Sequence, residues 1–233
     1  MDESLFVSVI LPCYNESGNI IPLIEHIHLQ LSFCNHEIIV VDDSSPDGTF
    51  DLVNNKKYDF VRAFLRTSDA SFAKSIRKGI EEAKGNALLV MDSDFNHQPM
   101  YIPQMVKNLA YYDCVSGSRF VYGGAMNSRL RHLASWIFNV FVRILTRKYV
   151  TDSLYGFFAI KRNIIQKLDY DKIFWGFGDY YIRFLYYLQE EKATILQIPV
   201  INGERLKGEG NSKFMKVFLQ YGLATIKLVL KRK

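Results

Sequence analysis

This sequence has few cysteines and no long apolar run. Its three cysteines, Cys13, Cys34 and Cys114, are far apart and odd in number. They fit neither a disulfide framework nor the spacing of a metal centre, so we expect a reducing compartment such as the cytosol. No apolar stretch reaches the roughly 20 residues that a membrane span requires. Asp2 and Glu3 precede only a short apolar run, so we expect no signal peptide.

Internal repeats, low-complexity tracts and a recognisable linker are also missing. The chain has 233 residues, of which 48% are hydrophobic and 23% charged, as in ordinary globular proteins. We therefore expect one domain over residues 1–233. The net charge of +5 suits a nucleic acid, an anionic membrane or a phosphorylated substrate equally well. Because no nucleic-acid-binding motif is recognisable, we expect no nucleic-acid partner.

Short apolar runs alternate with segments of helical spacing in the first half of the chain. Strands are predicted at residues 5–11, 37–41, 60–65 and 86–91, and helices at 20–31, 49–54 and 70–84. Gly85 is predicted to cap the C-terminus of the last of these helices. The alternation predicts an α/β fold with a mostly parallel sheet.

Polar side chains follow three of these strands. The pairs are Tyr14 and Glu16, Asp42 and Asp43, and Asp92 and Asp94. The carboxyl ends of parallel strands lie on one edge of a sheet, where open α/β folds bind ligands. We therefore expect the three pairs to converge on one site.

The third pair is part of a possible metal-binding segment. Asp92, Asp94 and Asn96 place three oxygen donors at a spacing of two residues. Such donors suit Mg²⁺ or Mn²⁺ beside a diphosphate. The alternative is a polar turn that closes a strand, since a lone D-x-D is a common pattern.

The second half of the chain is less regular. Helices are predicted at about 101–111, 128–147, 180–191 and 216–233, and strands at 114–118, 155–160 and 194–200. The helix over 128–147 is basic and carries an aromatic face, which fits a membrane interface and an ordinary docking helix equally well. Asp179 precedes the helix over 180–191, where it could be a catalytic base or an N-cap.

Four ordered motifs carry a family resemblance. They are Pro12-Cys13-Tyr14-Asn15-Glu16, Asp42-Asp43-Ser44-Ser45-Pro46-Asp47-Gly48-Thr49, Asp92-Ser93-Asp94-Phe95-Asn96-His97-Gln98-Pro99 and Ser118-Arg119-Phe120-Val121-Tyr122-Gly123-Gly124. With them the chain resembles the family 2 glycosyltransferases of GT-A fold, and within these the dolichol- or polyprenol-phosphate sugar synthases. The resemblance runs from about residue 7 to 213.

The resemblance implies a Rossmann-like GT-A sheet flanked by helices. Residues 1–100 would bind the nucleotide sugar, and residues 101–233 the acceptor, with amphipathic helices at about 128–147 and 213–231. It implies inverting transfer of a hexose, mannose or glucose, from a GDP- or UDP-sugar to a dolichyl or polyprenyl phosphate. The protein would be peripheral, on an anionic surface at the cytoplasmic face of a membrane. A membrane-protein partner or a homo-oligomer is left open.

The resemblance also implies roles for individual residues. The cofactor would be Mg²⁺ or Mn²⁺, held by Asp92, Asp94 and Asn96, although Asn96 stands where the synthases commonly have Gln. Asp94, Arg119 and Asp179 would be catalytic. Arg119, Arg131 and Ser135 would bind the acceptor phosphate, and the nucleotide sugar would be bound by Pro12, Tyr14, Glu16, Val41, Asp43, Met91, Asp92, Ser93, Arg205 and Lys213.

Two other functions compete with this one. A family 2 transferase acting on a glycan hydroxyl would need a base, for which Asp179 is the candidate. Asp42 and Asp43 also resemble the acidic pocket of a phospho-receiver domain. Receivers carry that pair after the first strand and are about half this length, whereas here it follows the second strand.

Overall fold

The computed structural model describes residues 5–204 and 214–230, and the side chains of these residues except those of 214–216. Within this part of the chain, one sheet contains seven strands in the order β3-β2-β1-β4-β6-β5-β7. They are β1 (Phe6–Cys13), β2 (Asn35–Asp42), β3 (Val61–Leu65), β4 (Ala87–Val90), β5 (Cys114–Ser118), β6 (Phe158–Lys161) and β7 (Ile195–Pro199). Only β6 runs antiparallel to its neighbours. The predicted mostly parallel α/β sheet is confirmed.

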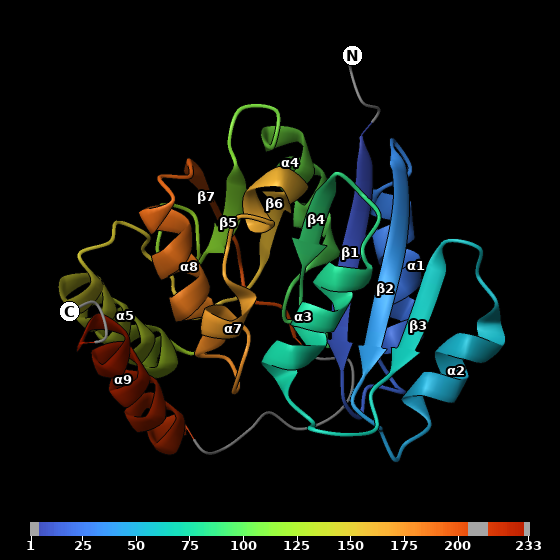
Figure 1. Ribbon diagram of the computed structural model, residues 1–233, viewed down its shortest axis with the longest axis horizontal. Helices are drawn as coiled ribbons and strands as arrows, with labels where there is room; N and C mark the ends of the chain where they lie inside the picture. The colour runs from blue at the N-terminus through green and yellow to red at the C-terminus, as the bar shows by residue number, and fades with distance from the viewer. Residues whose placement is uncertain (1–4, 205–213, 231–233) are drawn as a thin grey trace.

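Helices cover both faces of the sheet. One face packs against α1 (Ile20–Gln30) and α4 (Ile102–Asn108), and the other against α3 (Phe72–Glu82), α7 (Tyr170–Ile173) and α8 (Tyr180–Glu190). Figure 1 shows α3, α7 and α8 in front of the sheet and α1 behind it. Successive strand residues therefore enter different cores, as Ile10 and Leu11 do. This explains why the strands read as continuous apolar runs.

Glycine allows the chain to pack closely at two places near β1. A Cβ atom on Gly79 of α3 would lie 2.4 Å from Cγ2 of Ile10, so glycine lets the helix rest on the sheet. The prediction that Gly85 caps α3 is wrong, because the helix ends at Glu82 and Ala83 is its extended C-cap residue. A Cβ on Gly85 would lie 2.4 Å from the Phe6 carbonyl oxygen, so this glycine permits close passage beside β1.

Two long helices lie side by side at the end of the molecule remote from β3 (Figure 1). They are α5 (Arg129–Thr146) and α9 (Phe214–Leu230), and the ring centroids of Phe138 and Phe218 are 4.7 Å apart between them. Among the described residues, no helix combines the length and apolar character needed to cross a membrane. The remaining helical segments are α2 (Thr49–Lys56), η1 (Pro99–Tyr101) and α6 (Arg162–Ile165).

Candidate active site

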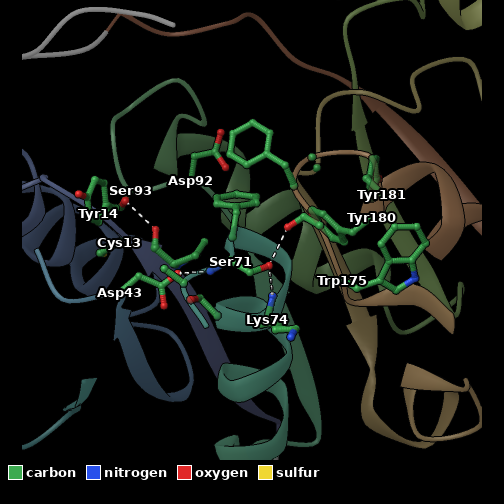
Figure 2. A pocket seen from close by; sticks show the side chains of 18 of the residues that line it. Cys13, Tyr14, Asp43, Ser71, Lys74, Asp92, Ser93, Trp175, Tyr180 and Tyr181 are labelled. Carbon is green, nitrogen blue, oxygen red and sulfur yellow. Dashed lines mark hydrogen bonds between the residues drawn. The ribbon is translucent and has the colours of Figure 1, made fainter. Parts of the chain in front are cut away.

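The carboxyl ends of β1, β2 and β4 meet at one edge of the sheet and border a cavity of about 1230 Å³. Figure 2 shows Cys13, Tyr14 and Asp43 on one side of this cavity and Trp175, Tyr180 and Tyr181 on the other. The predicted convergence of strand-end side chains is confirmed for Tyr14, Glu16, Asp43, Asp92 and Asp94, which all line the cavity. Asp42 is instead fully buried and accepts hydrogen bonds from Ser45.

The loop after β1 forms one end of the cavity. Tyr14 is exposed at its mouth, whereas Glu16 is buried and accepts a 2.6 Å hydrogen bond from Nδ2 of Asn19. The Glu16 backbone N–H donates to Oγ1 of Thr49 at the start of α2. Oγ of Ser93 donates to the Pro12 carbonyl at 2.9 Å, which joins this loop to the segment after β4.

Asp43 is held by an arginine that the sequence motifs did not single out. Nη1 of Arg66 lies 2.5 Å from Oδ1 of Asp43, and the backbone N–H of Ser71 donates to Oδ2 at 2.9 Å. Arg66 also donates to Oγ of Ser75 and to the Asp69 carbonyl. Arg66 follows β3 directly, so extending the strand-end rule to the third strand would have found it. Oγ of Ser71 bonds to the Gly176 carbonyl on the opposite wall (Figure 2).

Four predicted donor-site residues have side chains away from the cavity or outside the described part of the chain. Val41 and Met91 are fully buried in the cores on opposite faces of the sheet. Any contact that they make with a nucleotide sugar would therefore come from their backbone. Arg205 and Lys213 lie outside the described residues.

The segment after β4 presents two carboxylates to the cavity. Asp92 is partly exposed and Asp94 is almost fully buried. Asn96 donates to Asp94 twice, from its backbone N–H to Oδ1 at 3.0 Å and from Nδ2 to Oδ2 at 2.6 Å. Oδ1 of Asn96 faces Asn202, which donates to it at 3.2 Å.

The two carboxylates fit a hard divalent cation. Across residues 5–204 and 214–230 there is no group of three His, Cys, Asp or Glu side chains arranged to hold a metal. Mg²⁺ commonly takes one or two protein carboxylates and completes its shell with water and substrate phosphates. Asp92 and Asp94 supply such a pair on the wall of a cavity large enough for a nucleotide.

His97 is hydrogen-bonded to the backbone of this segment. The backbone N–H of Asp92 donates to Nδ1 of His97 at 2.8 Å, so the neutral ring carries its proton on Nε2. Complete burial lowers the pKa of His97 to about 3, because the charged imidazolium would lose its hydration. The ring stacks on Phe157, with centroids 5.0 Å apart. His97 belongs to the motif that begins at Asp92, but its role follows only from the fold.

Arg119 lies at the end of β5 in a buried ion pair with Asp152. Asp152 is fully buried and accepts from Nε and Nη2 of Arg119 at 2.8 and 2.9 Å. The guanidinium also lies over the ring of Tyr155, 4.7 Å from its centroid. Burial alone would lower the Arg119 pKa, but attraction to Asp152 outweighs it and the pKa is raised.

The other predicted acceptor residues lie on α5, and two contacts tie the helix to the region of Arg119. The rings of Phe120 and His132 meet edge to face, with centroids 4.9 Å apart. Asn139 accepts from the Ser153 backbone N–H at 2.7 Å, next to Asp152. Arg131 is exposed in the first turn of α5, whereas Ser135 is buried one turn later.

Asp179 is paired with Arg183 one turn along α8. The pair is buried, and Oδ1 of Asp179 also accepts from the Phe177 backbone N–H at 3.2 Å. Asp179 occupies the predicted N-cap position of α8, but its side chain makes no capping hydrogen bond to the helix. The Arg183 guanidinium stacks on Trp175, 3.7 Å from the ring centroid.

A family profile described as glycosyl transferase family 2 matches residues 8–169. The chain is 32% identical to a dolichol-phosphate mannosyltransferase of Pyrococcus furiosus, over 91% of this chain and 60% of that protein. It is 28% identical to the dolichol-phosphate mannosyltransferase of Saccharomyces cerevisiae, over 94% and 85%. An undecaprenyl-phosphate mannosyltransferase of Micrococcus luteus is 29% identical, over 87% and 86%. The chain thus spans less than two thirds of the Pyrococcus protein.

Solved structures share the fold. Glucosyl-3-phosphoglycerate synthase from Mycobacterium tuberculosis, in complex with Mn²⁺, UDP and glucosyl-3-phosphoglycerate, aligns with a TM-score of 0.72 over 97% of this chain and 80% of that one. A complex of the same enzyme with Mg²⁺ and UDP gives a TM-score of 0.70. Sequence identity is 19% and 18%, so the likeness concerns the fold, and it confirms the expected GT-A architecture.

Proposed function

Because the chain belongs to glycosyl transferase family 2, we propose that it moves a hexose, mannose or glucose, from a GDP- or UDP-sugar to a dolichyl or polyprenyl phosphate. The names of its relatives support this, since they are dolichol-phosphate and undecaprenyl-phosphate mannosyltransferases. The observation that carries the choice of acceptor is the buried pair of Asp179 and Arg183. The ion pair with Arg183 occupies the carboxylate of Asp179, which would have to act as the base if the acceptor were a hydroxyl.

The donor nucleoside would occupy the end of the cavity beside β1 and α3. Tyr14 and Pro12 would contact it from the loop after β1, together with Glu16. Asp43 faces the same space, and its orientation is fixed by Arg66 and by the Ser71 backbone. A carboxylate fixed in this way can accept hydrogen bonds from a base or ribose without first giving up rotational freedom.

The diphosphate would extend past Ser93 toward Asp92 and Asp94, which would hold Mg²⁺ or Mn²⁺. Such an ion, when bound, would act as a Lewis acid that neutralises charge on the departing nucleoside diphosphate. Arg205 and Lys213 are proposed to contact the diphosphate from the segment before α9. The hydrogen bond from Asp92 to His97 keeps the turn of this segment fixed.

The acceptor phosphate would attack the anomeric carbon from the side of Arg119, Arg131 and Ser135. An oxygen of the phosphate forms the new bond while the bond to the nucleoside diphosphate breaks, with inversion at that carbon. A phosphate is already anionic at neutral pH, so positioning by arginine suffices. Asp152 accepts from Nε and from one N–H of Nη2 of Arg119, so the N–H groups that remain for a phosphate oxygen are the two of Nη1 and the second of Nη2.

An apolar face on α5 and α9 supports a membrane location. We define it by eight side chains that are half or more exposed: Leu130, Leu133, Trp136, Ile137, Ile144, Leu219, Leu223 and Leu230. Exposed basic residues flank it, among them Arg129, Arg143 and Lys227. Apolar side chains can enter the headgroup region while basic residues meet anionic lipids. The proposal places the protein peripherally on an anionic membrane, at the cytoplasmic face, as its free cysteines suit.

A panel of radiolabelled GDP- and UDP-sugars, incubated with polyprenyl phosphate and Mn²⁺, tests the proposed function. We expect one sugar nucleotide to transfer label into the organic phase. Label that moves to a soluble glycan, with none extracted into the organic phase, would instead indicate a hydroxyl acceptor. The same panel identifies the sugar and the base together.

A further inference from the structure

The side chain of Asn96 is held at both ends by hydrogen bonds. Its Nδ2 donates to Oδ2 of Asp94 at 2.6 Å, and its Oδ1 accepts from Nδ2 of Asn202 at 3.2 Å. Asn202 follows β7 and is remote from Asn96 in sequence. The two amides and the carboxylate therefore form a chain of hydrogen-bonded side chains, which runs from the end of β7 to the proposed cation site.

The direction of donation along this chain is fixed by its two ends. A carboxylate such as that of Asp94 can only accept, and so can the Gly203 carbonyl, to which Nδ2 of Asn202 donates at 3.1 Å. Asn202 must therefore point its nitrogen at Gly203 and Asn96. Asn96 in turn presents its oxygen to Asn202 and its nitrogen to Asp94.

The backbone around Asn96 is fixed as well. The Asn96 carbonyl accepts from the Gly203 N–H at 2.9 Å and from the Tyr155 hydroxyl at 2.8 Å. A Cβ on Gly203 would lie 2.0 Å from the Phe95 carbonyl oxygen, so only glycine allows this contact. Turning the Asn96 oxygen toward the cavity would break the chain of amides on a backbone that is itself anchored.

We propose that Asn96 is a positioning residue for Asp94 and that Asn202 fixes its orientation, in place of the third cation ligand implied by the family resemblance. Mg²⁺ and Mn²⁺ bind oxygen, and the only side-chain oxygen of Asn96 faces Asn202. Its two hydrogen bonds to Asp94 orient that carboxylate on the cavity wall. This inference rests on the proposed function only in assuming a cation at Asp92 and Asp94.

The inference is tested with Mn²⁺ alone, without nucleotide. The affinity of Mn²⁺ is measured by electron paramagnetic resonance of the free ion, and its bound waters are counted by ¹⁷O relaxation. Loss of a residue that orients a metal ligand typically weakens affinity by about 10–100-fold. We expect Asn96→Ala and Asn202→Ala both to weaken Mn²⁺ binding by about 10-fold or more, with the wild-type number of waters. Asn127→Ala removes an exposed amide bonded to Glu204 and serves as the control.

Four outcomes would overturn the inference. One additional water on Mn²⁺ in Asn96→Ala would show that Asn96 is a ligand. An unchanged Mn²⁺ affinity in Asn202→Ala would show that Asn202 does not orient Asn96. Equal melting temperatures of both variants and wild type in EDTA would also contradict it, because these hydrogen bonds exist without the ion. A wild-type protein that binds no Mn²⁺ would overturn the cation site of the proposed function as well, and is thereby distinguished from the other results.

Discussion

Asp152 accepts two parallel hydrogen bonds from Arg119, with Nε to Oδ2 at 2.8 Å and Nη2 to Oδ1 at 2.9 Å. Its carboxylate also accepts from the backbone N–H groups of Arg119 and Leu154. The pair joins the end of β5 to the segment before β6. The arginine expected to bind the acceptor phosphate is therefore positioned by a residue that no motif identified.

Replacing Asp152 by alanine should strongly destabilise the protein. The substitution leaves the Arg119 guanidinium buried without its counter-charge, and breaking one partner out of a buried pair costs about 3–5 kcal/mol. Urea unfolding measures the change. Glu81→Ala removes the exposed partner of Arg77 and is the matched control, for which about 0.3–0.5 kcal/mol is expected. Similar losses in the two variants would contradict the structural role of Asp152.

Removing the carboxylate of Asp94 should abolish transfer while the protein stays folded. Asp94→Ala loses a negatively charged oxygen ligand from the cavity wall, and Asp92→Ala should be nearly as inactive. Turnover is measured with excess Mn²⁺ and in EDTA, and circular dichroism reports the fold. Asp171→Ala, at an exposed side chain paired with Arg77, should keep full activity. Wild-type activity in EDTA equal to that in Mn²⁺ would rule out a metal role for the two carboxylates.

Glu37 should make stability depend on pH in the acid range. Burial alone would raise its pKa, but hydrogen bonds from Ser8, the Lys84 N–H and Arg62 outweigh burial and lower it below 4.5. A carboxyl group whose pKa is lower in the folded state stabilises the fold above its unfolded pKa, and this contribution is lost as pH falls through the folded value. The free energy of unfolding of wild type minus that of Glu37→Gln should thus be largest above pH 4.5 and shrink below it. Urea unfolding from pH 3 to 7 measures it, and a pH-independent difference would contradict the assignment.

The apolar face should bind anionic vesicles. Leu133 and Ile137 lie one turn apart on α5 and are exposed by 55% and 56%. Changing both to glutamate should reduce co-sedimentation with vesicles that contain phosphatidylserine. Added salt should weaken wild-type binding, since each basic residue near such a surface contributes about 1 kcal/mol. Leu29→Glu, at a leucine 67% exposed on α1, should bind like wild type. Wild-type protein that stays in the supernatant at low salt would exclude this surface as a membrane anchor.

The sequence revealed those parts of the site that lie at strand ends. Asp43, Asp92 and Asp94 follow apolar runs, and parallel strands bring their ends to one edge whatever the details of packing. The direction of β6 could not be predicted, because an apolar run has the same pattern in either direction. Its position between β4 and β5 depends on which strands form hydrogen bonds with each other in the folded sheet.

The residues that position the site were missed for a different reason. Asp152 and Asn202 are each remote in sequence from the side chain that they hold, whereas Arg66 directly follows β3 and could have been found by the strand-end rule. No spacing rule connects such pairs, since only the folded sheet brings them into contact. Asp179, in contrast, was singled out by the sequence, because its position before a helix suggested a helix cap or a catalytic base. In the structure the Asp179 carboxylate is instead paired with Arg183, one turn along α8.

The acceptor is decided by comparing Arg131→Ala with Asp179→Asn. For a phosphate acceptor, Arg131→Ala should raise the KM for polyprenyl phosphate several-fold and leave donor affinity nearly unchanged, because a phosphate oxygen loses a charged donor. Asp179→Asn should have a modest effect on kcat, because a phosphate needs no base. Donor affinity by calorimetry is the control for Arg131→Ala.

Asp179→Asn needs a stability control, because it weakens the buried pair with Arg183 and so lowers the folded fraction. Activity is therefore divided by the folded fraction measured in the same buffer. If Asp179 were the base for a hydroxyl acceptor, the loss would remain after that correction, and kcat would fall by about 10²–10⁴-fold. Arg131→Ala would then be mild. If Asp179→Asn were folded but inactive while Arg131→Ala stayed active, the acceptor would be a glycan hydroxyl and not a lipid phosphate. Only a neutral nucleophile requires that its proton be removed.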